Sequence, residues 1–234
     1  MSMLKVQYIN TGYGKKQVLF DVNLVVEEGE TVLLIGSNGS GKSTLCKAAF
    51  GMLPLWSGEV YFDGELLHNS KRKTKSSKLI PEGLMYVPQK NELFEDMTVE
   101  KNLEMALLHM NNKKEANKRV QEVFDQNDIL AKNKMQVASR LSGGERKLLS
   151  LGMVLTNRPK MVLYDEPLAG LSGNNVSIVL KWLQAINENG TTLVIIEHRI
   201  KELMVYADKV VGLKLGQSSN ATLDNLERIK SFMI

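Results

Sequence analysis

The first residues with a chemical pattern form a glycine-rich run, Gly36-Ser37-Asn38-Gly39-Ser40-Gly41-Lys42-Ser43, with the spacing of a phosphate-holding loop. Its glycines let the backbone curl so that successive amides point at phosphate oxygens, and the next helix start adds partial positive charge. Lys42 would reach the β- and γ-phosphates of a nucleotide, and the Ser43 hydroxyl would help to hold Mg²⁺. An ordinary glycine-rich turn is the alternative. However, apolar residues 32–35 lead into the run and helix-compatible residues 44–50 lead out, so the sequence predicts a nucleotide site.

Two consecutive carboxylates, Asp165 and Glu166, follow the apolar residues 161–164 and precede Pro167. Because successive side chains of a strand point to opposite faces, the two acids cannot do the same work. We expect Asp165 to bind Mg²⁺ directly or through water, and Glu166 to point toward the γ-phosphate and polarise the attacking water. Alone, such a pair is typical of an exposed strand end. Beside a phosphate loop it predicts a hydrolytic site.

A third element, Leu141-Ser142-Gly143-Gly144-Glu145, lies 20 residues before the carboxylate pair. Its serine and glutamate, three residues apart, form a capping box that opens a helix. The apolar residues that give this helix one buried face are Leu148, Leu151 and Leu155. A capping box alone would be structural. In a chain that already has a phosphate loop, a helix start with two glycines and a serine predicts a second phosphate contact.

These groups need a framework that brings distant segments together. Short apolar runs, each typical of a strand buried on both faces, occur at 32–35, 84–87, 161–164, 193–196 and 210–213. Most of them precede a helical pattern, which indicates an α/β fold with a largely parallel sheet. Nearer the N-terminus, Leu4, Val6 and Tyr8 alternate with polar residues, and 18–26 is apolar and β-branched, so this part is expected to form strands.

The segment 91–158 differs in character, because it is rich in Leu, Met, Lys, Glu and Asn and has almost no strand pattern. Two stretches within it, 99–110 and 113–124, have the periodicity of amphipathic helices. We therefore predict one domain over 1–234, with an α/β core at 1–90 and 159–234 and an inserted helical subdomain at 91–158.

The composition is that of an ordinary globular chain: 234 residues, 43% hydrophobic and 24% charged. No apolar run approaches the roughly 18 residues of a membrane helix, and the N-terminus lacks the apolar block of a signal peptide. We therefore expect a chain that neither spans a membrane by itself nor is exported by that route. One Cys excludes an internal disulfide and a cysteine-cluster metal site.

The charge is unevenly distributed along the chain. The formal net charge is +4, and removing the five positive charges of segment 71–78, which contains no acid, leaves −1. A uniformly basic nucleic-acid binder is therefore excluded. The segment is either a solvated loop or a contact for an anionic membrane surface or partner. Its cations are Lys71, Arg72, Lys73, Lys75 and Lys78.

With these motifs in this order, the chain resembles the ATP-binding cassette (ABC) ATPases over about residues 3–215. In that family Leu-Ser-Gly-Gly is the signature sequence, which binds the γ-phosphate of the nucleotide held by a second subunit. The resemblance implies that Ser142, Gly143 and Gly144 act on the ATP of the opposite cassette in a head-to-tail dimer.

Three weaker positions also match the family's order. The resemblance implies that Gln89 lies near Mg²⁺ and the attacking water, that His198 contacts the γ-phosphate, and that Tyr13 stacks on adenine. Each residue alone could instead have a purely structural role: Gln89 as a loop residue, His198 as a structural histidine, and Tyr13 as a turn or core aromatic.

The resemblance implies an ATPase that uses ATP and Mg²⁺. Its fold would be an α/β phosphate-loop NTPase core with a mainly parallel sheet, an N-terminal antiparallel β subdomain and an inserted helical subdomain. The implied catalytic residues are Glu166, His198, Gln89 and Lys42, and those that hold the metal are Ser43, Gln89 and Asp165. The residues expected to bind ATP are Tyr13, Gly36, Ser37, Asn38, Gly39, Ser40, Gly41, Lys42, Ser43 and Thr44, with Ser142, Gly143 and Gly144 acting across the dimer.

One position departs from the family pattern. An Asp usually follows Ala-Gly-Leu, whereas Ala169-Gly170-Leu171 is followed here by Ser172, which can form a hydrogen bond but carries no charge. We expect slower hydrolysis or different coupling between the two ATP sites. Because Glu166 is present, an inactive enzyme is not inferred.

The segments 50–60, 84–89 and 93–103 resemble importer cassettes, and they are most similar to the branched-chain amino-acid branch. The resemblance implies a subunit of a membrane transporter, working with integral-membrane subunits and a second cassette at the cytoplasmic face of the membrane. No nucleic-acid partner is expected. The alternatives are a soluble ABC ATPase that acts on nucleic acid or a cytoplasmic complex, and a lipid or lipopolysaccharide export cassette.

Overall fold

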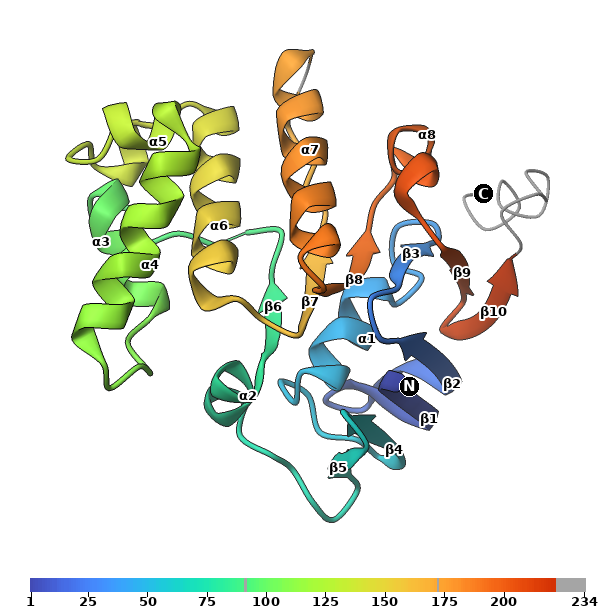
Figure 1. Ribbon diagram of the computed structural model, residues 1–234. Helices are drawn as coiled ribbons and strands as arrows, with labels where there is room; N and C mark the ends of the chain where they lie inside the picture. Colours follow the sequence, from blue (N-terminus) through green and yellow to red (C-terminus); the bar gives the residue numbers. More distant parts are fainter. Residues whose placement is uncertain (91, 172, 222–234) are drawn as a thin grey trace.

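The structure is a computed structural model, and it describes residues 1–90, 92–171 and 173–221 (Figure 1). Its central sheet has the strand order β10-β9-β3-β8-β7-β6. The strands are β3 (Thr31–Ile35), β6 (Leu84–Val87), β7 (Met161–Asp165), β8 (Thr192–Ile196), β9 (Lys209–Lys214) and β10 (Gln217–Ala221). All neighbours pair in parallel except β10, which is antiparallel to β9.

The parallel pairing brings the chemical motifs to one edge of the sheet. Leu34 lies opposite Ile196 in β8, and Asp165, the last residue of β7, lies opposite the same Ile196. Since the carboxyl ends of parallel strands meet at one edge, the loops after β3, β7 and β8 lie side by side.

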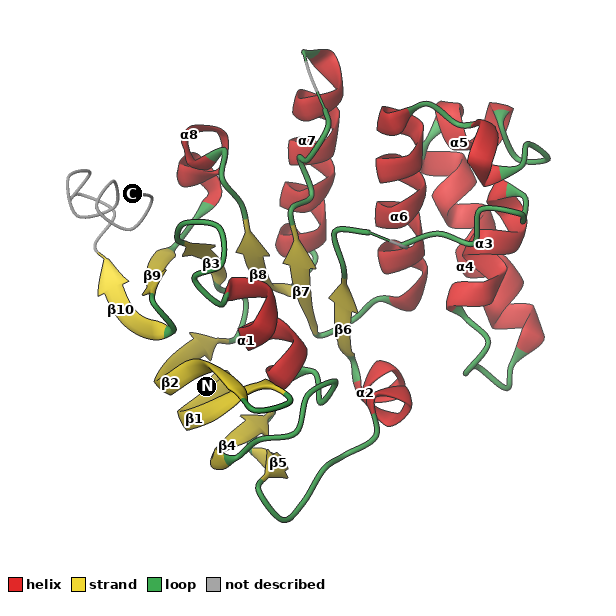
Figure 2. Ribbon diagram, turned by 180° about the vertical axis from the view of Figure 1, so that it is seen from behind, coloured by secondary structure: helices red, strands yellow, loops and turns green. Residues whose placement is uncertain are grey.

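A second, antiparallel sheet has the order β2-β1-β4-β5. Its strands are β1 (Ser2–Tyr13), β2 (Lys16–Glu27), β4 (Ser57–Phe62) and β5 (Glu65–Asn69). Helix α1 (Lys42–Ala49) lies between the two sheets (Figure 2), where its Leu45, Cys46 and Ala48 are buried. Helix α2 (Ser76–Glu82) precedes β6.

A group of helices lies beyond β6. It comprises α3 (Val99–Ala106), α4 (Lys113–Gln126), α5 (Asp128–Lys132), the short 3₁₀ helix Ala138–Arg140 and α6 (Gly143–Asn157). Helices α7 (Asn174–Glu188) and α8 (Ile200–Leu203) connect the later strands, and a second 3₁₀ turn, Met204–Tyr206, follows α8. Figure 1 shows α3 to α6 gathered at the end of the molecule opposite β10.

The central sheet is buried on both faces. Val32 and Leu34 belong to a core shared with the antiparallel sheet and α1, whereas Leu33 and Ile35 belong to a core shared with α7. This alternation is the period of two that a strand imposes on its side chains. A third core fills the helical region. The predicted α/β fold, with its mainly parallel sheet, antiparallel N-terminal strands and helical region, is confirmed.

Two local expectations, on the helix at 99–110 and on the buried face of α6, were wrong, and Tyr8 departs from the alternation within the confirmed strand β1. Tyr8 is 64% exposed with φ 47°, because a register shift between Val6 and Ile9 puts Ile9 in the buried position instead. The helix expected over 99–110 ends at Ala106, although Leu107 is still buried in the helical core and Met110 packs against that core.

Helix α6 was expected to have one buried face but has two. Leu148 and Leu149 pack into the helical core, whereas Leu151 and Val154 pack into the core behind the central sheet. Its position between the other helices and α7 explains this, because no side of its middle turns faces solvent fully.

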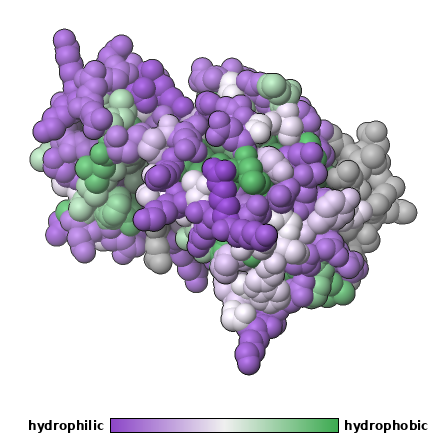
Figure 3. All heavy atoms as spheres, turned by 90° about the horizontal axis from the view of Figure 1, so that it is seen from below, coloured by the Kyte–Doolittle hydropathy of each residue, from purple (hydrophilic) through white to green (hydrophobic). Residues whose placement is uncertain are grey.

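No helix within the described residues combines the length and the apolar character that crossing a membrane would require. The loop that carries Lys71, Arg72 and Lys73 is the lowest part of Figure 1, and much of the surface seen from below is hydrophilic (Figure 3). All five cations of segment 71–78 are exposed, and within the described part of the chain none of them forms an ion pair.

Candidate functional site

The glycine-rich run connects β3 to α1, and two of its glycines have no room for a side chain. A Cβ on Gly36 would lie 2.2 Å from the backbone oxygen of Leu213, and one on Gly41 would lie 2.7 Å from Leu19 Cδ2. Gly41 also has φ 108°, in the region that favours glycine. The loop is therefore held tightly against β9 and β2 while its outer side stays open.

Lys42 is folded back onto the loop. Its Nζ donates to the carbonyl oxygens of Gly36 at 2.7 Å and Ser37 at 3.0 Å, and the residue is only 6% exposed. Burial lowers the pKa of this amine, and the negative charges of Glu166 and Asp165 oppose that shift. Within the described residues the buried Ser40 hydroxyl has no hydrogen-bond partner. Donors gathered in this way suit an anion with several oxygens, such as a nucleotide phosphate chain.

A cavity of about 710 Å³ opens above the loop. Tyr13, Val18 and Phe20 contribute apolar surface to its lining, and Glu166 and His198 contribute polar groups. Tyr13 is 48% exposed, and its hydroxyl lies 3.5 Å from Thr44 Oγ1. The lining therefore combines an aromatic wall, a phosphate loop and an acid. Lys16, Phe20 and Leu215 also line it, although no pattern in the sequence points to them.

Three predicted residues from three segments meet at Glu166. Gln89 Nε2 donates to Oε2 of Glu166 at 2.5 Å, and His198 Nε2 lies 3.3 Å from Oε1. Glu166 has φ 54° and directly follows β7, and its backbone amide donates to Ile196 at 2.9 Å. The two acids have different partners, Tyr86 for Asp165 and Gln89 for Glu166.

Asp165 is 4% exposed and accepts a hydrogen bond of 3.2 Å from the hydroxyl of Tyr86. The two consecutive acids thus have different surroundings, as the strand alternation requires. Within the described residues no group of three or more His, Cys, Asp or Glu side chains could hold a metal ion. The expected set is instead a hydroxyl, an amide and a carboxylate, from Ser43, Gln89 and Asp165, and such oxygen donors fit Mg²⁺.

The signature residues lie at the start of α6, outside the lining of the cavity. Ser142 and Glu145 form the predicted capping box: the Ser142 amide donates to Glu145 Oε2 at 2.8 Å, and its hydroxyl accepts from the Glu145 amide at 3.4 Å. Hydrogen bonds from the side chain and backbone of Ser142 hold the pKa of Glu145 below its usual value. Ser142 and Gly143 are exposed, so a second molecule can reach them.

His198 is positioned by a buried acid, Glu197, that no pattern in the sequence indicated. Glu197 is 4% exposed and accepts backbone hydrogen bonds from Leu168 at 2.7 Å, His198 at 2.8 Å and Arg199 at 3.1 Å. It thereby joins the loop after β8 to the segment that follows Glu166. Its only signal in the sequence is an acid directly after an apolar strand.

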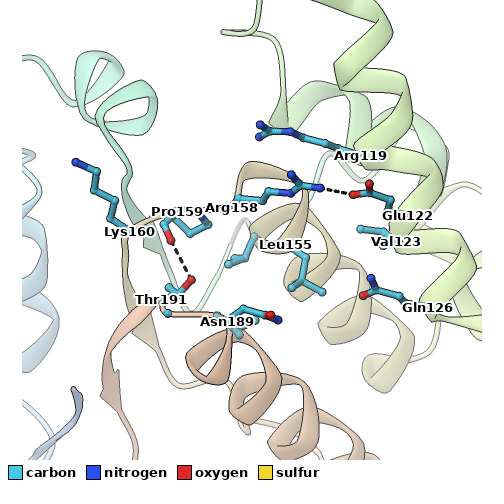
Figure 4. A pocket seen from close by; sticks show the side chains of 13 residues that line it. Arg119, Glu122, Val123, Gln126, Leu155, Arg158, Pro159, Lys160, Asn189 and Thr191 are labelled. Carbon is cyan, nitrogen blue, oxygen red and sulfur yellow. Dashed lines mark hydrogen bonds and ion pairs between the residues drawn. The ribbon is translucent and has the colours of Figure 1, made fainter. Parts of the chain in front are cut away.

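Another cavity, of about 530 Å³, lies between α4, the end of α6 and the end of α7 (Figure 4). Arg158 pairs there with Glu122, and Thr191 donates to the backbone oxygen of Pro159 at 2.9 Å. None of the predicted site residues lines it. The chemistry of the lining therefore favours the cavity above the phosphate loop as the functional one.

Comparison with known proteins agrees with this geometry. Residues 19–169 match the family described as ABC transporter. The chain belongs to this family. It is therefore an ATP-binding cassette with ATPase activity, the ATP-binding subunit of an ABC transporter, and the resemblance in its motifs is confirmed.

Two curated relatives match over nearly the whole cassette. The high-affinity branched-chain amino acid transport ATP-binding protein BraG of Pseudomonas aeruginosa is 32% identical over 215 residues, which is 92% of this chain and 90% of the relative. The probable branched-chain amino acid transport ATP-binding protein LivF of Archaeoglobus fulgidus is 30% identical over 232 residues, 98% of this chain and 96% of the relative.

A solved structure of a nucleotide-free ATP-binding cassette from an ABC transporter superposes with a TM-score of 0.84 at 26% identity, covering 99% of this chain and 96% of that one. An ATP-binding cassette of an ABC transporter in its ADP conformation gives a TM-score of 0.83 at 27% identity, covering 99% and 97%. This chain therefore shares the fold of ATP-binding cassettes of ABC transporters.

Proposed function

We propose that this cassette hydrolyses ATP for an importer of amino acids or similar polar solutes. The names of BraG and LivF support the solute class, and so does the glutamine transport ATP-binding protein GlnQ of Escherichia coli, 31% identical over 92% of this chain and 89% of the relative. In our proposal the choice of solute belongs to other subunits of the transporter.

The observation that carries the enzymatic part is the convergence of Gln89 and His198 on Glu166 beside the phosphate loop. In our proposal Glu166 accepts a proton from the attacking water, while Gln89 and His198 hold the two carboxylate oxygens of Glu166 in place. Lys42 exchanges its loop carbonyls for the β- and γ-phosphates, and the remaining loop residues, from Gly36 to Thr44, donate to the phosphates.

Mg²⁺, held by Ser43, Gln89 and Asp165, would neutralise charge on the β- and γ-phosphates. Tyr13 also lines this cavity, which supports our proposal that it stacks on the adenine ring. The buried position of Asp165 and the partly exposed position of Glu166 in the cavity lining support their separate roles.

We further propose that two cassettes close head to tail. Ser142, Gly143 and Gly144 are too far from the cavity of their own chain to line it, and they are at a helix start that can donate to an anion. They would contact the ATP of the opposite cassette. Ser172, where the family usually has an Asp, is outside the described residues, and its effect on coupling stays a prediction.

The proposed partners are integral-membrane subunits, with the cassette peripheral at the cytoplasmic face of the membrane. The division into a core at 1–90 and 159–234 and a helical subdomain at 91–158 is also retained as a proposal. The helical part would move against the core as the nucleotide site closes.

Isolation of the chain from gently solubilised membranes of its own cells tests the proposal. We expect a protein with several membrane spans to accompany it, and the solute-binding protein of the same complex to identify the solute. Recovery in the soluble fraction only, with nucleic acid bound to segment 71–78 in a salt-sensitive way, would contradict the transporter role. That result would not affect the assignment of the ATP site.

A further inference from the structure

Glu92 and Lys147 form the most buried ion pair in the described part of the chain. Lys147 Nζ lies 2.7 Å from Glu92 Oε1, and the two side chains are only 7% and 11% exposed. The next least exposed pair, Arg119 with Glu115, is 21% and 32% exposed. A buried carboxylate without its partner would be strongly disfavoured, so Glu92 must follow any movement of Lys147.

Two further side chains complete this network. The Ser150 hydroxyl donates to the second carboxylate oxygen of Glu92 at 2.8 Å, and the Tyr164 hydroxyl lies 3.0 Å from Ser150 Oγ. Because Ser150 has already used its proton, Tyr164 donates to Ser150. Burial raises the pKa of Tyr164, which keeps the phenol protonated for this role.

The four residues come from the three segments that carry the catalytic groups. Glu92 lies three residues after Gln89, in the loop that follows β6. Lys147 and Ser150 are on α6, whose first turn presents the signature residues 142–144. Tyr164 immediately precedes Asp165 and Glu166 in β7. One carboxylate thus connects the loop of Gln89, the signature helix and the strand of the two acids.

We propose that four positioning residues couple the position of α6 to the position of the Gln89 side chain against Glu166. They are Glu92, Lys147, Ser150 and Tyr164. A shift of α6, as when its signature residues engage a second cassette, would carry Glu92 with it and change the contact between Gln89 and Glu166. This inference rests on the proposed roles of Gln89 and Glu166 and concerns how they are aligned.

A neighbouring ion pair offers a matched comparison. Arg146, also on α6, pairs with Glu95, from the same loop as Glu92, but Glu95 is 60% exposed and Arg146 29%. An exposed pair exchanges readily with water and holds its partners weakly. If burial is what transmits movement, loss of this second bridge between the same two segments should have little effect.

The experiment measures kcat and the equilibrium Kd for MgATP with the full-length chain. We expect Lys147→Met to lower kcat by about tenfold or more with Kd changed less than about twofold, because alignment is lost while the binding surface is kept. Arg146→Met should change kcat by less than about twofold. In a Gln89→Ala background, Lys147→Met should cause no further loss, since both substitutions disturb one contact.

A single variant that leaves one charge buried could fail to fold. The double variant Glu92→Gln with Lys147→Met removes both charges and keeps an acceptor for Ser150, so a folded protein is expected, with the same loss of kcat. Wild-type kcat in this folded double variant would overturn the proposal. Equal fold-losses from Lys147→Met with and without Gln89 would overturn it too.

Glu166→Gln, measured in parallel, separates this proposal from the proposed function. Lost turnover in Glu166→Gln with wild-type turnover in the double variant would reject the coupling alone. Wild-type turnover in Glu166→Gln would reject the catalytic assignment on which the coupling depends.

Discussion

The imidazole of His198 lies 3.3 Å from the carboxylate of Glu166, although 31 residues separate them and they follow different strands. Parallel pairing of β7 with β8 makes the contact possible, because it aligns the ends of both strands at one edge of the sheet. The buried carboxylate of Glu197 fixes the backbone of His198 from the other side. Glu166 and His198 together line the cavity above the phosphate loop.

Glu166→Gln should abolish most turnover while preserving nucleotide binding. The amide keeps the size of the side chain but cannot accept a proton, so we expect kcat to fall by about 10²–10⁴. Steady-state phosphate release and equilibrium ATP binding measure the two effects. Glu188→Gln, an exposed change on α7, is the control. Turnover unchanged by Glu166→Gln would rule out the general-base role.

Lys42→Ala should reduce the free energy of ATP binding by more than it reduces the free energy of unfolding. A charge-assisted hydrogen bond contributes about 1.5–3 kcal/mol, so we expect the Kd for ATP to rise by about tenfold or more. Titration with a fluorescent ATP analogue measures it. Lys47→Ala, on the same helix but outside the cavity lining, should leave Kd unchanged. Equal affinity in the two variants would remove Lys42 from the site.

Substitutions at Ser142 should separate its capping role from its proposed contact with nucleotide. Ser142→Ala removes a cap and should lower the free energy of unfolding by about 1 kcal/mol. Ser142→Asn restores an N-cap without a second carboxylate beside Glu145, but its larger amide replaces the small hydroxyl where a phosphate would bind, so stability should recover and turnover should not. Urea denaturation and phosphate release report the two properties, with Ser139→Ala as an exposed control. Full turnover in Ser142→Asn would contradict a phosphate contact.

The fold should lose stability as the pH falls below the ordinary histidine pKa, and His68 should account for part of the loss. Burial is the main cause that lowers the pKa of His68 from 6.5, and the cations Lys73 and Arg72 add to it. Its Nδ1 accepts from the Thr74 amide at 3.1 Å and its Nε2 lies 3.2 Å from the Ala49 carbonyl, so the neutral form is required.

A group whose folded pKa lies below its unfolded pKa stabilises the fold fully above the unfolded value and loses this effect as the pH falls. The free energy of unfolding should therefore decline from about pH 6.5 downward. In His68→Gln that slope should be smaller, whereas the exposed His109→Gln should retain it. Urea denaturation at a series of pH values measures the slopes, and identical slopes in all three proteins would exclude His68.

Much of the framework could be predicted because short apolar runs between turns have few alternatives to a buried strand. The run 84–87 coincides with β6, and the runs in β7 and β8 are one residue shorter than the strands. The order of the strands in the sheet could not be predicted in this way. The runs 161–164 and 193–196 are equally apolar, and only packing decides that β8 lies between β3 and β7.

The site was predictable where a motif has a local mechanism, as in the phosphate loop and the capping box. It was not predictable where a contact joins loops of irregular backbone. Glu92 and Glu197 have no periodicity in the sequence that would mark their side chains as largely buried. The hydrogen bond from Tyr86 to Asp165 joins the neighbouring strands β6 and β7, and no pattern in the sequence indicates it. The exposure of Tyr8 within β1 has a related cause, since a register shift between Val6 and Ile9 moves the following side chains to the other face.

The single cysteine, Cys46, is on the side of α1 that faces the core behind the phosphate loop, and it is 2% exposed. Burial, with the charge of Asp165, raises the pKa of its thiol, and only the thiolate reacts readily with oxidants and alkylating reagents. Oxidising conditions should therefore leave the ATP site chemically untouched. A cysteine introduced on the surface would be the only reactive thiol of the chain, so probes could be attached at chosen positions without first removing Cys46.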